Sequence, residues 1–325
     1  MFIHMGLDES AFSPVELEAM DELLAAGVRL HELYLEQRHA QGRAARFAVM
    51  SSDNQALKDL FWLNKGPIAT TLTNTREPLV AVLNEEAGKN VYPAGMTRKT
   101  MNAFLEANPD KRDELLDLLA AVWEASDANK SKAINGLDVY PTLDVLHPGL
   151  RERISKARGY MGIPYSVAYA ADIFFIYDRL NAAAAILSPT DMSYTRFLRL
   201  RARDLLANNY DGGDATWVSS QFSGNLNTQI GSYETYDDAL YGVKSFFSLS
   251  LLYKDKVKSD ELSAAISGIQ DIEDALPYDA HKTMRNFIPV GVYNVLADFG
   301  QSRGTNTATI LPNESHLSRQ FGRTI

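Results

Sequence analysis

Residues 165–187, YSVAYAADIFFIYDRLNAAAAIL, form the most apolar stretch of the chain and bear most directly on its fold class. The stretch is long enough to cross a bilayer, but Asp172, Asp178 and Arg179 lie inside it. Each of these charges would cost about 2.5–3.5 kcal/mol near the centre of a bilayer. We therefore predict that this stretch is a buried helix of a soluble protein and that the chain has no membrane partner.

Amphipathic patterns on both sides of this stretch predict further helices, because apolar residues recur three or four positions apart. Ser13, Pro14 and Glu16 mark the start of the first helix, since Ser13 can cap it and Glu16 can close a capping box. Strand patterns are few, so the sequence predicts an α+β fold that is predominantly helical with a small β component. The predicted helices cover residues 110–126, 193–208, 236–253 and 260–276, and the predicted strands cover residues 228–236 and 307–311.

Composition and charge exclude several classes of protein. The 325 residues are 46% hydrophobic, which is enough for a sizeable core in one or two domains. A net charge of -9 repels phosphate backbones, so we predict no nucleic-acid partner. The lack of cysteine excludes disulfides and thiolate nucleophiles and fits a cytoplasmic protein. No secretory leader is visible, and a periplasmic location stays open if a leader has been removed.

A histidine-glutamate pair resembles the start of a zinc-peptidase helix. In that helix a second histidine stands one turn after His31 and Glu32, where this sequence has Leu35 and Glu36. We therefore interpret the segment as an ordinary surface helix.

Two groups of charged residues also have simple structural interpretations. One group of arginines shares a helical face and is interpreted as a solvated face, although such a face can clamp an anion. One group of aspartates lacks the spacing of a calcium loop and is interpreted as turn formers and helix caps. The arginines are Arg196, Arg199 and Arg203, and the aspartates are Asp211, Asp214, Asp237 and Asp238.

The segment GSYETYDDALYG, residues 231–242, carries the clearest chemical signal. Residues two apart share a face on an extended chain, so Glu234 and Tyr236 point into one space. A carboxylate beside a phenol can bind a cationic group and donate a hydrogen bond to a developing oxyanion.

At this segment the sequence resembles the dipeptidyl-peptidase III family of zinc metallopeptidases, which carries an E-[ST]-Y motif in its substrate cleft. Other segments occur in the order found in that family. Residues 198–206 and 214–217 resemble the family's helix before the cleft strand, and the L-P-N-E segment follows at 311–314. The resemblance implies that Tyr236 is catalytic, stabilising the oxyanion, and that Glu234 and Asn313 bind substrate. The expected ligand is a peptide or a small molecule.

The resemblance also implies what this chain lacks. The family's H-E-x-x-x-H zinc helix follows the L-P-N segment, and no two of the six histidines here have that spacing. We therefore predict no metal ligands and no stoichiometric zinc in this chain, with zinc present only if a C-terminal lobe exists. The family carries a glutamate on the helix after E-[ST]-Y that helps to hold the amino terminus of the peptide, and this sequence has Ser248 at that position. The family also carries an asparagine three positions before the Asn of L-P-N, and this sequence has Ile310 there.

These features predict the non-zinc lobe of a two-lobed metallopeptidase. Residues 1–190 would form a helical region and residues 191–325 a cleft-forming region, or both would form one domain. The favoured function is the substrate-binding lobe of a zinc-dependent peptide hydrolase, incomplete as given. The alternatives are a non-catalytic protein that binds a peptide or small ligand, and a purely structural scaffold. A C-terminal lobe or a second copy is an expected partner, and residues 307–325 are expected to expose apolar groups.

Overall fold

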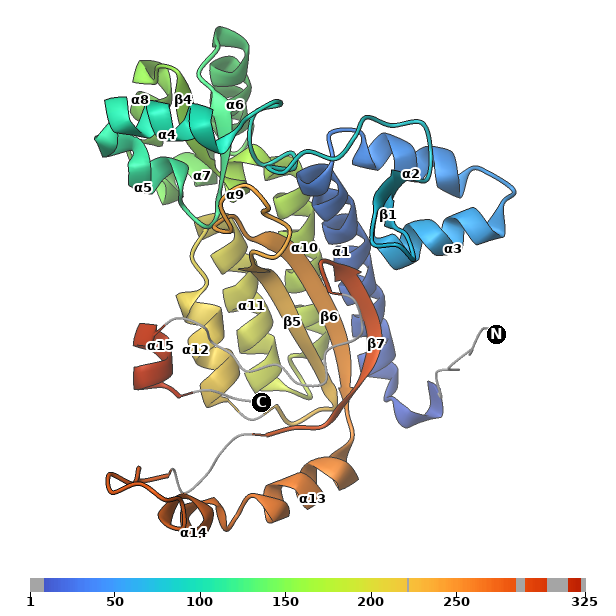
Figure 1. Cartoon of the computed structure of the whole chain (residues 1–325). Helices are drawn as coiled ribbons and strands as arrows, with labels where there is room; N and C mark the ends of the chain where they lie inside the picture. Colours follow the sequence, from blue (N-terminus) through green and yellow to red (C-terminus); the bar gives the residue numbers. More distant parts are fainter. Residues whose placement is uncertain (1–8, 221, 285–289, 303–314, 323–325) are drawn as a thin grey trace.

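The computed structural model describes residues 9–220, 222–284, 290–302 and 315–322 (Figure 1). These residues form mainly α-helices, with three small sheets whose strands all pair antiparallel. This confirms the predicted fold class, a predominantly helical α+β protein. The predicted division at residue 190 stays a prediction.

The centre of the molecule is a three-stranded sheet, in the order β5-β6-β7, that packs on three long helices. Figure 1 shows the helices behind the sheet, and α10 lies between α1 and α11. Helix α1 contacts β6 and β7, and α11 contacts β5, so helices and strands share one hydrophobic core. The helices are α1 (Pro14–Arg38), α10 (Ala170–Leu187) and α11 (Met192–Ala207), and the strands are β5 (Leu226–Glu234), β6 (Phe246–Lys254) and β7 (Tyr293–Gly300).

Two smaller parts flank this centre in Figure 1. One contains the hairpin β1-β2 and two helices that cover a small core of Leu35, Ala45, Val49 and Phe61. Its elements are α2 (Gly42–Met50), α3 (Gln55–Asn64), β1 (Ile68–Thr70) and β2 (Arg76–Pro78).

The other flanking part is built on the antiparallel pair β3-β4. Short helices surround this pair, and the 3-10 turn Pro109–Lys111 leads into α5. Its elements are α4 (Arg98–Ala107), α5 (Arg112–Leu115), β3 (Ala120–Glu124), α6 (Asp127–Val139), α7 (Pro141–Leu146), α8 (Leu150–Lys156) and β4 (Tyr160–Pro164).

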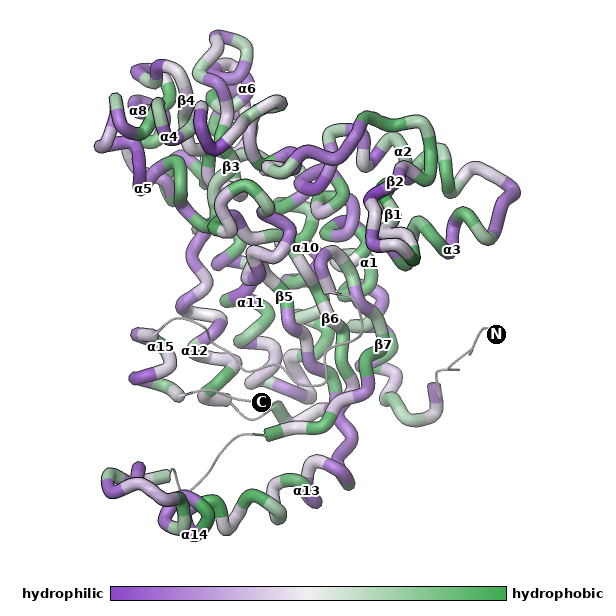
Figure 2. The backbone as a smooth tube through the Cα atoms, in the orientation of Figure 1, coloured by the Kyte–Doolittle hydropathy of each residue, from purple (hydrophilic) through white to green (hydrophobic). Residues whose placement is uncertain are grey.

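Several short helices complete the described chain. Between β6 and β7 the chain projects beyond the sheet as α13 and α14, along which hydrophobic and hydrophilic residues alternate (Figure 2). Helix α15 contacts α12. The short helices are η1 (Glu9–Ala11), α9 (Tyr165–Ala168), α12 (Asp211–Ser219), α13 (Lys256–Ala265), α14 (Ile269–Asp274) and α15 (Ser315–Gln320).

The start of α1 confirms the predicted capping box. The Ser13 hydroxyl accepts a hydrogen bond from the Glu16 amide at 3.2 Å. The Glu16 carboxylate accepts one from the Ser13 amide at 2.9 Å, so two amides at the helix end are satisfied.

The apolar stretch 165–187 is helical and largely buried, as predicted, but it breaks at Tyr169, whose φ is -123°. The side chain of Asp172 inside it forms ion pairs with Arg29 and Arg43, which compensate its charge. In the part of the chain that the structure describes, no helix is long and apolar enough to span a membrane.

Two predicted helices are wrong. Residues 110–126 form the short α5 and then strand β3, which pairs with β4. Residues 236–253 form a loop and then strand β6, which pairs with both β5 and β7. In both cases pairing with distant strands overrides a local pattern of apolar residues that also suits a helix.

The remaining predicted elements have mixed outcomes. Strand β5 begins two residues before the predicted strand 228–236 and ends at Glu234, which confirms that prediction apart from its ends. The predicted helix 260–276 is divided by Gly268 into α13 and α14. The predicted strand 307–311 lies outside the described residues.

Candidate functional site

The E-T-Y segment lies where β5 ends. Ser232 faces Phe247 and Glu234 faces Phe246, so Tyr233 is an extra residue in β5 and forms a bulge. A bulge redirects the side chains that follow it. The bulge therefore separates the buried course of β5 from the segment that carries Glu234 and Tyr236.

Glu234 and Tyr236 lie side by side at this strand end. The carboxylate of Glu234 raises the pKa of the Tyr236 phenol through its negative charge and a hydrogen bond between the two side chains. Tyr236 is 83% exposed, so its phenol is accessible to a ligand and is not part of the core. The structure thus brings this predicted pair together, while the role of each residue stays a prediction.

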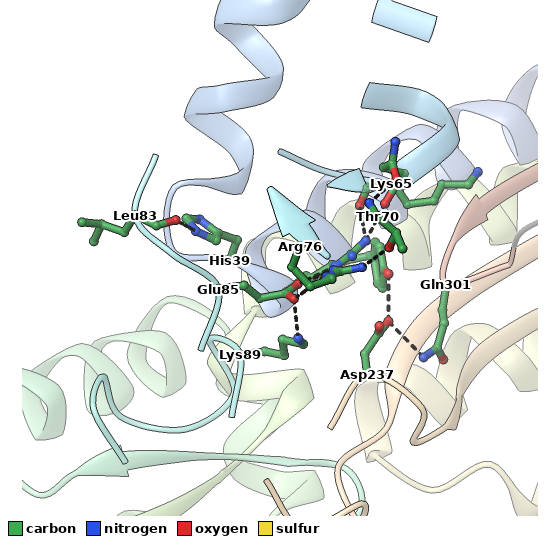
Figure 3. Close-up of polar contacts among 12 residues, drawn as sticks. His39, Lys65, Thr70, Arg76, Leu83, Glu85, Lys89, Asp237 and Gln301 are labelled. Atoms are coloured by element: carbon green, nitrogen blue, oxygen red, sulfur yellow. Dashed lines mark hydrogen bonds and ion pairs between the residues drawn. The ribbon is translucent and has the colours of Figure 1, made fainter. Parts of the chain in front are cut away.

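Asp237 ties this segment to the centre of the fold. Its Oδ2 atom accepts hydrogen bonds from the Tyr34 hydroxyl at 2.8 Å and from Gln301 Nε2 at 3.1 Å (Figure 3). Tyr34 belongs to α1, and Gln301 directly follows β7. The backbone next to Tyr236 is therefore held from two elements that are distant in sequence.

Asp238 organises the loop after the segment. Its carboxylate accepts hydrogen bonds from the backbone amides of four residues and from the Tyr92 hydroxyl, which confirms the interpretation of this aspartate as a turn former. Lys244 on the same loop is fully buried, and burial lowers its pKa to about 7. Lys244 Nζ donates to the carbonyl of Asp117 at 2.6 Å and so fixes the loop to the segment before β3. The four amides belong to Leu240, Tyr241, Val243 and Lys244.

A second group of charges, here called the Arg38–Glu85 cluster, consists of Arg38, Arg76, Glu85 and Lys89 (Figure 3). Glu85 forms ion pairs with all three cations, at 3.4 Å to Arg38, 2.9 Å to Arg76 and 3.1 Å to Lys89. These charges lower the pKa of Glu85 against the opposing effect of its burial. Arg38 is also near Tyr34 and Asp237, which raise its pKa, so the cluster adjoins the E-T-Y segment.

A third group, here called the Arg201 cluster, consists of Arg201, Asp204, Asp214 and Tyr233. The fully buried Arg201 forms an ion pair with Asp214, and the Tyr233 hydroxyl donates to Asp214 at 2.6 Å. Burial raises the pKa of Asp204 to about 6, although the charge of Arg201 opposes this shift. The cluster anchors the bulge of β5 to α11 and α12.

The motifs of the sequence analysis have different outcomes in the structure. His31 is only 2% exposed, so the interpretation of its segment as a surface helix is wrong at this residue. Its Nδ1 accepts a hydrogen bond from the Gly300 amide at 3.1 Å, which joins α1 to the end of β7.

Among the described residues, no group of three or more acids or histidines is placed to hold a metal ion. Three arginines are exposed on α11 as expected, namely Arg196, Arg199 and Arg203.

Two further site expectations concern the segments around β6 and the L-P-N motif. Asn313 lies outside the described residues, as does Ile310. Ser248 lies within strand β6, opposite Gly231 and Gly300, so its expected place on a helix after the E-T-Y segment is wrong. The strand forms because β5 and β7 both pair with it.

Sequence reasoning missed most of the residues that surround Glu234 and Tyr236. Arg201 had a usable signal, because Leu198 and Leu205 lie three and four positions from it and share its buried helix face. The Arg38–Glu85 cluster had at most a local signal, the spacing of Glu85 and Lys89, because Arg38 lies 47 positions before Glu85 and only the fold brings it to the other three.

Comparison with solved structures identifies the fold of the described chain. The chain has the fold of dipeptidyl-peptidase III structures, which confirms the resemblance at the level of fold. One is the dipeptidyl-peptidase III of Caldithrix abyssi, with 21% identity and a TM-score of 0.76 over 98% of this chain and 55% of that chain. Another is the enzyme of Corallococcus sp. strain EGB, with 22% identity and a TM-score of 0.76 over 99% of this chain and 55% of that chain.

Sequence comparisons add one curated relative. Nudix hydrolase 3 of Arabidopsis thaliana is 22% identical over 239 residues, which are 72% of this chain and 29% of that protein. No family model matches the chain. The chain thus spans about half the length of the solved structures and less than a third of the curated relative that it matches.

Proposed function

We propose that this chain is the peptide-binding half of a peptide hydrolase of the dipeptidyl-peptidase III type. The observation that carries the proposal is the closeness of the Glu234 carboxylate to the exposed Tyr236 phenol at the end of β5. The similarity of the whole chain to dipeptidyl-peptidase III structures supports it.

The pair can recognise the amino end of a peptide. The carboxylate of Glu234 attracts a free ammonium group, and a charge-assisted hydrogen bond is stronger than a neutral one. A bound ammonium would replace the Tyr236 phenol as the partner of Glu234. The phenol, which carries its proton at neutral pH, would then be free to donate to a peptide carbonyl oxygen.

The described residues do not fit a zinc ion. No cluster of three potential ligands occurs among them, and the six histidines of the sequence lack the spacing of a zinc helix. In a complete peptidase, zinc would therefore need ligands other than the described residues of this chain. The proposal for this chain rests on binding and orientation of the peptide.

Isothermal titration calorimetry with tetra-alanine and with N-acetyl tetra-alanine tests the proposal. We expect the free amine to bind at least tenfold more tightly than the acetylated peptide, because only the free amine carries a charge for Glu234. Glu234→Gln should abolish this preference, and Tyr236→Phe should weaken the binding of both peptides. The control is Tyr241→Phe, which removes a phenol from the same loop that bonds to Asn102.

The same samples separate the proposal from its alternatives. Equal binding of both peptides would contradict a site for the amino terminus, and no binding of either peptide would leave a structural scaffold. Binding with no cleavage in mass spectrometry, also in the presence of added zinc, is expected of this chain both as half of a peptidase and as a non-catalytic peptide-binding protein, so the titrations test the binding site and not catalysis.

A further inference from the structure

The Arg38–Glu85 cluster contains more positive than negative charge. Its three cations share the single carboxylate of Glu85. Asp237 is the other anion whose charge acts on Arg38 and Lys89, and it already accepts hydrogen bonds from Tyr34 and Gln301. Three cations therefore face two anions, in a protein whose overall charge is -9.

Two of the cations keep unused hydrogen-bond donors. Arg76 uses three N–H groups, two for Glu85 and one for the Thr70 hydroxyl, while a guanidinium group has five. Lys89 forms one ion pair, with Glu85, while an ammonium group has three N–H groups. Among the described residues, two N–H groups on each side chain thus lack an acceptor. Arg38 is different, because it also donates to the carbonyls of Asn64 and Lys65.

The position of Lys89 is itself unfavourable. The residue has a φ of 50°, in the left-handed region that residues other than glycine seldom adopt. Its side chain is only 8% exposed, and burial lowers the pKa of its ammonium in spite of the nearby Glu85. Such strain often occurs where a side chain has a binding role. The side chain of Arg76 is 39% exposed, so the cluster is open to solvent on that side.

We propose that Arg76 and Lys89 form an anion subsite that binds a carboxylate group of the peptide ligand. This proposal deepens the proposed function and depends on it for the identity of the ligand as a peptide. A carboxylate would accept the unused N–H groups of both side chains and balance the excess positive charge. Since Asp237 follows Tyr236 directly and lies in the electrostatic field of this cluster, a single peptide can reach both sites.

The carboxylate can come from an acidic side chain or from a carboxyl terminus, and blocked peptides distinguish these sources. N-acetyl-Ala-Ala-Glu-amide carries only a side-chain carboxylate, and N-acetyl-tri-alanine carries only a terminal one. N-acetyl-Ala-Ala-Gln-amide has neither and is the neutral reference. None of these peptides has a free amine, so their binding does not require the amino-terminus site.

Isothermal titration calorimetry should show at least one carboxylate peptide binding roughly tenfold more tightly than the neutral reference, as expected for one charge-assisted contact. Arg76→Gln and Lys89→Met should each remove this preference, while Lys89→Arg should keep most of it. Glu85→Gln removes the built-in competitor and should strengthen carboxylate binding several-fold. A matched control is Arg199→Gln, which removes an exposed arginine on α11 outside the cluster and should change nothing.

Two results would overturn the subsite. One is equal or undetectable binding of all three blocked peptides by both the unmodified protein and Glu85→Gln. The other is a carboxylate preference that survives Arg76→Gln, a variant on an exposed strand that is expected to fold even if Lys89→Met does not. Failure of the proposed function looks different, because free tetra-alanine would then bind no better than its acetylated form while the carboxylate preference remains.

Discussion

The Arg201 cluster and the Arg38–Glu85 cluster both support the E-T-Y segment, but they differ in charge balance and burial. In the Arg201 cluster one cation faces two acids, and Arg201 is fully buried. In the Arg38–Glu85 cluster three cations share one acid, and only the side chain of Arg76, at 39% exposed, is open to solvent, while those of Arg38, Glu85 and Lys89 are mostly buried. Unused donors occur in both clusters, since Arg201 Nε and Nη1 have no hydrogen-bond partner among the described residues. The difference is that the Arg201 cluster is closed to solvent, whereas the Arg38–Glu85 cluster has excess positive charge and is open to a ligand at Arg76.

The largest expected effect is the loss of stability when the buried ion pair between Arg201 and Asp214 is removed. Asp214→Ala should lower the free energy of unfolding by about 3–5 kcal/mol, because it leaves a buried guanidinium with too little negative charge. Guanidinium chloride denaturation measures this loss. The double replacement of Arg201 by Met and Asp214 by Leu should recover part of this stability. A loss below about 1 kcal/mol for Asp214→Ala would contradict a buried ion pair that stabilises the fold.

The next effect is a dependence of stability on pH that comes from the buried His31 of α1. Burial, Lys65 and Arg46 lower the pKa of His31 from 6.5 to about 3. Below pH 6.5 the unfolded chain thus binds a proton at His31 that the folded chain does not, so stability falls as the pH falls. The expected loss is about 1 kcal/mol for each pH unit below 6.

His31→Asn isolates this contribution. Asparagine keeps an acceptor for the Gly300 amide but does not titrate, so its stability should depend less on pH between 6.5 and 5 than that of the unmodified protein. Asp204, whose pKa is raised to about 6, acts in the opposite direction in both proteins, since its folded form takes up a proton first on acidification. Identical pH profiles for the two proteins would show that His31 titrates normally.

A smaller effect is expected in the open cluster. Glu85→Gln should cost about 1–3 kcal/mol in thermal or chemical denaturation. Solvent screens Arg76, and the amide keeps an acceptor, but the mostly buried Arg38 and Lys89 lose the charge that pairs with them. Arg38 keeps its bonds to the carbonyls of Asn64 and Lys65 in this variant. A loss as large as that for Asp214→Ala would make the two clusters alike and remove the basis of the comparison.

The smallest effect is expected on the outer face of α11. Arg199→Gln should change the free energy of unfolding by less than about 0.5 kcal/mol, since Arg199 is exposed. Arg201, two positions later on the same helix, is fully buried. Denaturation of Arg199→Gln beside Arg201→Met therefore tests, within one helix, whether burial decides what an arginine contributes.

Local patterns predicted the elements that depend on neighbours in sequence. The Ser13–Glu16 capping box, the helix at 193–208 and the course of β5 need only the spacing of nearby residues, and the structure shows all of them. Strand β6 was predicted as part of a helix because apolar residues such as Phe246, Phe247 and Leu251 suit either structure. Its two partner strands decide the outcome, and β7 is about 50 residues away by the spacing of Ser248 and Gly300.

For the candidate site, the sequence alone determined that Glu234 and Tyr236 lie two residues apart. Tyr236 lies in a turn after β5 and not on an extended strand, so the spacing by itself did not place the two side chains together. Only the tertiary structure decided what supports them, because Tyr34 lies more than 200 positions before Asp237 and Gln301, and they meet through packing of α1 against β6 and β7. The same packing encloses Arg201 and leaves Arg76 open to solvent. The sequence determines which residues carry a charge. Contacts between distant segments determine which of these charges are buried, and burial decides whether a charge must be paired inside the protein or is left for a ligand.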